Sequence, residues 1–211
     1  MSEIIITANK LTKSFKSGDT ELTVLKGLEL EVPKSQFLSI TGRSGSGKST
    51  LMYQLGLLDR PTSGDITIEG INVSLLSDTE RTRFRLNELG YVFQDYALLP
   101  ELSSLENVIV PLLMQGVPKF AARDKALYAL SKIGLAQKLD NLPSQLSGGE
   151  QQRVSIARAI AHEPKIIFAD EPTANLDTET ANVVLDAFLD LNAEGQTIIM
   201  VTHEPEYAAL T

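Results

Sequence analysis

The chain has 211 residues, of which 43% are hydrophobic and 22% are charged, a balance typical of one soluble globular domain. Its 27 acidic and 19 basic residues give a formal net charge of −8, which argues against a protein that binds duplex nucleic acid through a positive surface. The chain contains no cysteine, so disulfide bonds and thiolate metal sites are excluded.

The first third of the chain combines two kinds of strand with one helix. Segments 3–8, 22–32 and 65–70 have the pattern of antiparallel strands closed by turns such as SGD and EGIN. Segment 37–42, FLSITG, is apolar without alternation, which is typical of a buried parallel strand. A helix is predicted to follow it at 48–58. We therefore expect an antiparallel β subdomain beside a strand–turn–helix unit.

The sequence GRSGSGKST lies between that strand and that helix and matches the phosphate-loop pattern G-x-x-x-x-G-K-[ST]. Its glycines let the backbone approach phosphate oxygens, and its amide groups present positive partial charge to them. Lys48 is expected to reach the β- and γ-phosphates, and Ser49 to offer its hydroxyl to Mg²⁺. A chance glycine-rich turn would match in roughly one chain in a hundred of this length. We therefore predict a nucleoside triphosphate site formed by Gly42, Arg43, Ser44, Gly45, Ser46, Gly47, Lys48, Ser49 and Thr50.

The middle of the chain departs from the strand–helix rhythm. Residues 95–147 are predicted to be almost wholly helical, with amphipathic runs near 104–115 and 120–133. We expect them to form a helical subdomain inserted into a single domain, whose ATP-binding core would comprise 1–94 and 148–211.

The strand–helix rhythm resumes in the last third of the chain. Helices are predicted at 150–161 and 178–192, and apolar buried strands at 166–170 and 197–203. Repeated strand, turn and helix indicate an α/β fold with a parallel sheet. Together with the phosphate loop, this predicts a P-loop NTPase core of the RecA-like type.

Candidate catalytic side chains follow two of these strands. Asp170 is expected to hold Mg²⁺ beside the phosphate loop, and Glu171 to polarise a water in line with the γ-phosphate. An Asp-Glu pair after a strand is by itself more often a solvated turn, but the phosphate loop reverses that preference. His203 is placed to donate a hydrogen bond to the γ-phosphate, although such histidines are commonly plain surface residues. His162 is expected to be a surface residue at a helix end.

The ordered motifs of the chain resemble those of the nucleotide-binding subunit of ABC transporters. LSGGE at 146–150 is similar to the signature motif of that family, and NLD at 175–177 to its D-loop. Gln94 in YVFQD resembles the Q-loop glutamine, and His203 the switch histidine. Phe15 stands where the family carries an aromatic ring that stacks on adenine; an aromatic at a strand end is otherwise often a core residue.

The resemblance implies a mechanism that uses two anion sites. In ABC ATPases two subunits dimerise head to tail, so Ser147 and Gly149 would contact ATP held by the phosphate loop of the other subunit. Gln94 would reach Mg²⁺ and the attacking water at the entry to the helical subdomain. The catalytic set implied is Lys48, Gln94, Glu171 and His203; the metal set is Ser49, Gln94 and Asp170; the further nucleotide contacts are Phe15, Ser147, Gly148, Gly149, Glu150 and Asp177.

The partners implied are a second copy of the chain and integral-membrane permease subunits. Segments 55–70 and 98–117 resemble the branch that includes lipoprotein-release, macrolide-export and cell-division ATPases, which favours export or extraction. A regulatory ATPase of a non-transporting, permease-like complex and a soluble ABC ATPase remain alternatives. No secretory signal and no run of the ~20 apolar residues of a membrane span is found, so we expect a cytoplasmic protein that reaches the membrane through the permease without inserting into it.

Three departures from the family pattern accompany this resemblance. Arg43 stands where the branch more often has proline, and Ala174 and Asn175 stand in TANLD, the D-loop sequence, where a glycine is frequent. Neither substitution removes a catalytic group. Family members continue beyond the position of Thr211 through a helix and further strands, so we expect an edge of the sheet to be missing.

Overall fold

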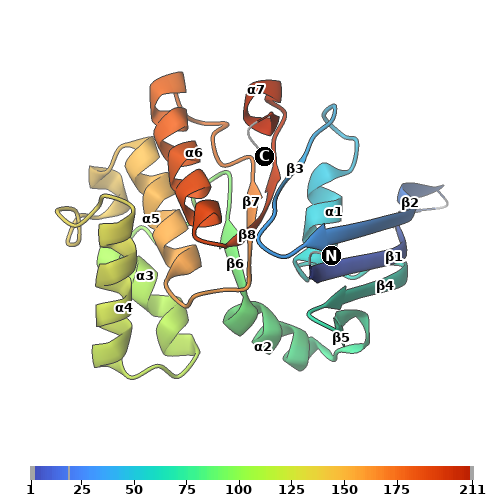
Figure 1. Cartoon of the computed structure of the whole chain (residues 1–211), viewed down its shortest axis with the longest axis horizontal. Helices are drawn as coiled ribbons and strands as arrows, with labels where there is room; N and C mark the ends of the chain where they lie inside the picture. The colour runs from blue at the N-terminus through green and yellow to red at the C-terminus, as the bar shows by residue number, and fades with distance from the viewer. Residues whose placement is uncertain (1–2, 19, 210–211) are drawn as a thin grey trace.

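The computed structural model describes residues 3–18 and 20–209, and its strands form two sheets of four strands each (Figure 1). The antiparallel sheet has the order β2-β1-β4-β5. Its strands are β1 (Ile4–Ser17), β2 (Thr20–Pro33), β4 (Ser63–Ile68) and β5 (Ile71–Asn72). The predicted antiparallel strands are confirmed, although the first runs on to Ser17 as one arm of a long hairpin.

The second sheet is parallel throughout and has the order β3-β8-β7-β6. Its strands are β3 (Phe37–Ile40), β8 (Thr197–Val201), β7 (Ile166–Asp170) and β6 (Leu89–Val92). The three predicted parallel strands therefore lie side by side, and the α/β fold is confirmed. Strand β6 was not predicted. The structure describes residues only up to 209, so it does not test the expectation that an edge of the sheet is missing beyond Thr211.

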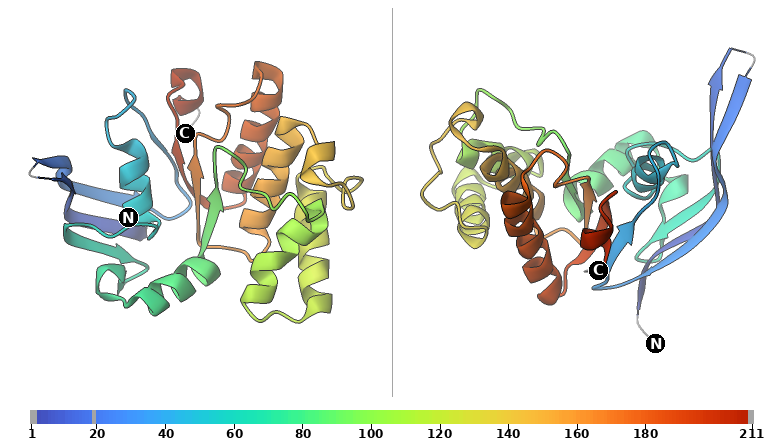
Figure 2. Two further views of the ribbon diagram at one scale, coloured as in Figure 1. Left: turned by 180° about the vertical axis from the view of Figure 1, so that it is seen from behind. Right: turned by 90° about the horizontal axis from the view of Figure 1, so that it is seen from above.

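Helices cover both faces of the parallel sheet. Helix α1 (Lys48–Leu55) lies between the two sheets, as the right-hand view of Figure 2 shows. The opposite face carries α5 (Gly148–Ile160) and α6 (Thr178–Ala193), and α3 (Ser104–Met114) and α4 (Lys119–Lys132) pack on α5. The remaining helical elements are α2 (Asp78–Glu88) and the short η1 (Val73–Leu75), η2 (Pro143–Gln145) and α7 (Pro205–Ala208). None of the helices in the described ranges has the length and apolar character needed to cross a bilayer.

Successive side chains of the central strand contribute to two different cores. Ile166 and Phe168 of β7 pack with α1 and the antiparallel sheet. Ile167 and Ala169 pack with the helices on the other face. Because strand side chains alternate between faces, an apolar run without alternation is what a strand buried on both sides requires. Packing on both faces of the sheet therefore explains why the sequence of this strand is continuously apolar.

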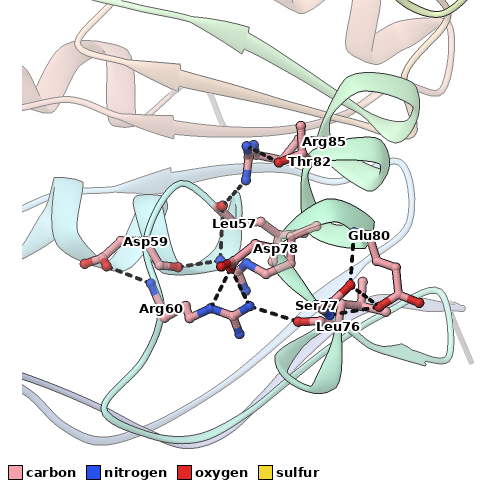
Figure 3. Close-up of polar contacts among 10 residues, drawn as sticks. Leu57, Asp59, Arg60, Leu76, Ser77, Asp78, Glu80, Thr82 and Arg85 are labelled. Atoms are coloured by element: carbon pink, nitrogen blue, oxygen red, sulfur yellow. Dashed lines mark hydrogen bonds and ion pairs between the residues drawn. The ribbon is translucent and has the colours of Figure 1, made fainter.

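Helix α2 docks onto the segment that follows α1 through a cluster of arginines (Figure 3). The guanidinium groups of Arg81 and Arg85 both donate to the carbonyl of Leu57, at 3.1 and 2.9 Å. Arg60 reaches back to the Asp78 carboxylate at the start of the helix, at 2.7 Å. Leu57 has a left-handed backbone conformation with φ of 62°, which ends α1 before the predicted residue 58.

Three further predictions need correction. Only α3, α4 and the short η2 are helical within 95–147, so the prediction of an almost wholly helical segment was wrong for the connections on either side of them. His162 is half-buried rather than a surface residue. Its Nε2 atom lies 3.1 Å from the carbonyl of Leu89, and burial lowers the pKa of the imidazole. Predicted strand 197–203 ends at Val201, which leaves His203 in the following loop.

Candidate functional site

The carboxyl ends of the parallel strands meet at one edge of the sheet. Val201 of β8 pairs with Ile40 of β3 on one side and with Asp170 of β7 on the other. Val92 of β6 pairs with Ala169, one residue before Asp170 on β7. The segments that follow these four strands therefore emerge together, at the edge where open α/β sheets bind ligands.

The phosphate loop connects β3 to α1 at this edge. Its glycines Gly45 and Gly47 have positive φ values of 75° and 95°, which favour residues without a side chain. A Cβ atom on Gly47 would also lie 2.6 Å from Cγ1 of Val24 on β2. Lys48 is buried, and its ammonium group donates to the carbonyls of Gly42 and Arg43, at 3.0 and 3.3 Å. The loop therefore encloses a cation that forms no ion pair with a carboxylate of residues 3–18 or 20–209.

Asp170 is held by two hydroxyl groups of α1. Ser49 donates to Oδ1 of Asp170 at 3.1 Å, and Tyr53 donates to Oδ2 at 3.0 Å. Burial raises the pKa of Asp170, and the two hydrogen bonds oppose that rise. Tyr53 was not predicted as a site residue. The signal was available, because residues four apart on a helix share one face and Tyr53 follows Ser49 by four.

Glu171 and His203 face one another beside the loop. Glu171 has a left-handed conformation with φ of 44°, so its side chain leaves the strand end in a direction different from that of Asp170. Nδ1 of His203 lies 3.3 Å from Oε2 of Glu171. Both residues line a cavity of about 900 Å³ whose other wall includes Gly42 and Lys48. Strained backbone of this kind is concentrated at functional sites.

The start of α5 presents a second group of polar side chains, separate from those beside the phosphate loop. Ser147 is exposed and caps the helix: its hydroxyl accepts from the amide of Glu150 at 3.3 Å, and the Glu150 carboxylate accepts from the amide of Ser147 at 2.9 Å. Lys138 also pairs with Glu150, at 3.2 Å. These hydrogen bonds lower the pKa of Glu150. Glu150 therefore has partners within its own chain, while Ser147 is exposed to solvent.

The D-loop packs directly against this helix end. A Cβ atom on Gly149 would lie 2.0 Å from Cγ2 of Thr180, and one on Gly148 would lie 3.3 Å from Leu176. Asp177 caps α6 by accepting from the amide and the hydroxyl of Thr180, at 3.0 and 2.8 Å, which lowers the pKa of Asp177. Thr180 is a second residue that the sequence patterns did not single out.

The two remaining predicted site residues are Gln94 and Phe15. The exposed Gln94 follows β6 at the same edge, where its carbonyl accepts from Asn175 at 3.0 Å. Phe15 lies on β1, 45% exposed, with the Lys13 ammonium 5.1 Å from its ring centroid. It pairs with Leu22 on β2. Figure 1 and the left-hand view of Figure 2 show where the two predicted anion sites lie. The loop between β3 and α1 is on one side of the molecule, and the connection into α5 is on the opposite side.

The side chains at this edge fit a magnesium nucleotide. A hydroxyl and a carboxylate within 3.1 Å of each other are the hard oxygen donors that Mg²⁺ prefers. The loop amides, the start of α1 and Lys48 offer positive charge to phosphate groups. Ser49 and Asp170 would hold the metal, and residues 42–50 would hold the phosphates.

Comparison with known proteins agrees with this geometry. Residues 25–174 match the family model described as "ABC transporter". The chain is 54% identical to the lipoprotein-releasing system ATP-binding protein LolD of Aquifex aeolicus, over 89% of this chain and 84% of the relative. It is 46% identical to the macrolide export ATP-binding/permease protein MacB of Chlorobaculum tepidum, over 94% of this chain but only 30% of that longer protein.

A solved structure has the same fold over nearly the whole chain. The dimeric post-hydrolysis state of the ATP-binding cassette MJ0796, bound to ADP and Pi, matches with a TM-score of 0.88 and 39% sequence identity. The match covers 97% of this chain and 90% of the other. By sequence, fold and the arrangement of its motifs, the chain belongs to the ABC transporter family.

Proposed function

We propose that this protein is an ATP-hydrolysing subunit that dimerises on ATP and drives a membrane permease. The observation that carries the proposal is one cavity bordered by the phosphate loop with Lys48 on one side and by the Glu171–His203 pair on the other. A buried cation, a carboxylate base and an imidazole around one space are the groups that phosphoryl transfer to water requires.

Each of these residues has a separate task in the reaction. Lys48 leaves the loop carbonyls and donates to the β- and γ-phosphates, which neutralises their charge. Glu171 accepts the proton of the attacking water, and His203 donates a hydrogen bond to the γ-phosphate while its other nitrogen faces Glu171. A Mg²⁺ ion held by Ser49 and Asp170 would supply further positive charge to the phosphate oxygens.

The second anion site supports a head-to-tail dimer. Ser147 is exposed at the start of α5, and the connection into α5 lies on the opposite side of the molecule from the loop between β3 and α1 (Figure 1). It therefore reaches a phosphate only on another molecule. Two such contacts related by a two-fold axis would close two composite sites, with Gly149 and Asp177 beside each. The dimeric cassette MJ0796 has the same fold, which supports this arrangement.

The permease partner follows from the relatives. LolD is named as part of a lipoprotein-releasing system and MacB as an export ATP-binding/permease protein. By analogy, we propose that the chain lies on the cytoplasmic face of the membrane, bound to a permease that exports or extracts its substrate. Residues 95–147 would form the subdomain that transmits the state of Gln94 to this partner.

Nucleotide binding by Lys48→Ala tests the proposal. We expect this variant to lose binding of a fluorescent ATP analogue, because the loop loses its only enclosed cation. Lys119→Ala removes an exposed lysine of α4 and is the matched control, which should bind as the unaltered protein does. Unchanged affinity of Lys48→Ala would refute the assignment of the loop.

A further inference from the structure

Arg158, near the end of α5, holds the segment that follows β6. Its guanidinium donates to the carbonyl of Tyr96 at 2.9 Å and to the carbonyl of Ala97. A third hydrogen bond joins it to the hydroxyl of Ser155, one turn earlier on the same helix, at 3.3 Å. The planar guanidinium can serve two neighbouring carbonyls at once, which an ammonium group does less well.

The carbonyls that Arg158 binds belong to two residues in a costly conformation. Tyr96 and Ala97 have positive φ values of 63° and 48°. Two successive residues with side chains seldom adopt this left-handed region, because each pays a steric penalty. Such a turn persists only where its surroundings hold it, and the two hydrogen bonds from Arg158 are placed to do so.

The rest of the same segment is also fixed through its carbonyls. Gln152 of α5 donates to the carbonyl of Phe93 at 3.5 Å, and Asn175 of the D-loop donates to that of Gln94 at 3.0 Å. The side chain of Gln94 is left exposed at the edge of the sheet. The position of that side chain is therefore set by the backbone on either side of it.

We propose that Arg158 is a positioning residue for Gln94: it holds the left-handed turn at Tyr96 and Ala97 that fixes where the Gln94 side chain stands at the nucleotide edge. The inference rests on the role proposed above for Gln94. Arg158 lies on α5, the helix that Ser147 caps. One rigid element therefore carries both the proposed contact of Ser147 with the nucleotide of the second subunit and the hydrogen bonds of Arg158, called here the clamp, that hold the segment after Gln94. A movement of α5 relative to β6 would displace Gln94 as well.

The test uses substitutions at both ends of the clamp in the full chain, with phosphate release and nucleotide affinity measured separately. Arg158→Met should lower kcat about tenfold or more, since an ångström of misplacement can cost about 100-fold. Affinity for the nucleotide should change less than about twofold, because the phosphate loop is untouched. Ala97→Val should reproduce the loss with Arg158 in place, because a β-branched residue resists a positive φ.

Rescue separates a positioning role from a merely structural one. Glycine adopts the left-handed region without penalty, so Ala97→Gly alone should retain activity. Combined with Arg158→Met, it should restore about fivefold in kcat, equivalent to about 1 kcal/mol at 1.36 kcal/mol per tenfold. Arg123→Met, which removes an exposed arginine of α4, is the control and should have no effect. If Arg158→Met retains the wild-type kcat, the proposal is overturned. If that variant does not fold, a wild-type kcat in Ala97→Val overturns the proposal instead.

Failure of the inference is distinguishable from failure of the proposed function. An unaltered protein that neither binds nor hydrolyses ATP overturns the function itself. A Gln94→Ala variant with the wild-type rate overturns the role of that glutamine. A protein that is active, is slowed by Gln94→Ala and is unaffected by Ala97→Val overturns the clamp alone.

Discussion

Substitution of Gly149 by alanine tests how closely the start of α5 packs on the first turn of α6. The new Cβ would lie 2.0 Å from Cγ2 of Thr180, well inside the ~3.5–4.0 Å of an ordinary carbon contact. Such overpacking costs about 1–3 kcal/mol, and the helix preference of alanine over glycine returns at most about 1 kcal/mol. We therefore expect Gly149→Ala to lower the free energy of unfolding by about 1–2 kcal/mol, measured by urea denaturation without nucleotide.

Thr180→Ser removes the obstructing methyl group and leaves the cap of α6 in place. The nearest remaining atom, Cβ of residue 180, would lie 3.5 Å from the new Cβ, an ordinary contact. The serine hydroxyl can still donate to Asp177, as the threonine does at 2.8 Å. Gly149→Ala should therefore cost little in this background, a coupling of about 1–2 kcal/mol in the double-mutant cycle. An equal cost in both backgrounds would refute the reasoning.

Three further substitutions test other parts of the account. Ser77→Ala removes the cap of α2 and should lower the free energy of unfolding by about 1 kcal/mol; an unchanged urea midpoint would contradict the capping role. Burial, and then the hydrogen bond to Asp170, raise the pKa of Tyr53 from 10.0 to about 12, so the stability its hydroxyl gives is complete below pH 10 and is lost as the pH rises through 12. Melting curves of Tyr53→Phe between pH 9 and 12 should lack that part of the alkaline decline, and an identical decline would contradict a raised pKa at Tyr53. Ser147→Arg should leave ATP binding by the single chain intact and abolish turnover; weakened binding would instead place Ser147 in the site of its own chain.

Much of the fold and of the site was predictable because the signals are local. The phosphate loop, the apolar strand before Asp170 and the strand before His203 each occupy a continuous stretch of sequence. Their meeting at one edge follows from the rule that parallel strands end together. Helix α2 and strand β6 were missed because one is almost wholly polar and the other has four residues. The capping box at Ser77 and Glu80 was the available signal for α2.

The contacts that orient the site could not be predicted from sequence, because they join distant segments. Arg158 binds the carbonyl of Ala97, 61 residues away, and Tyr53 binds Asp170, 117 residues away. A backbone carbonyl carries no sequence signature. The positive φ values at Ala97 and Glu171 are likewise set by the surrounding structure and not by residue type. His162 was misassigned for the same reason, since its partner is the carbonyl of Leu89.

The shared ATP site is tested most directly by the mass of Glu171→Gln in solution, measured by light scattering with and without Mg²⁺-ATP. Removal of the base should permit binding and prevent hydrolysis, so the nucleotide would stay between the two chains. We expect the mass of one chain without nucleotide and twice that mass with it. A mass that stays at one chain while ATP is bound would contradict the claim that two copies close the site by themselves.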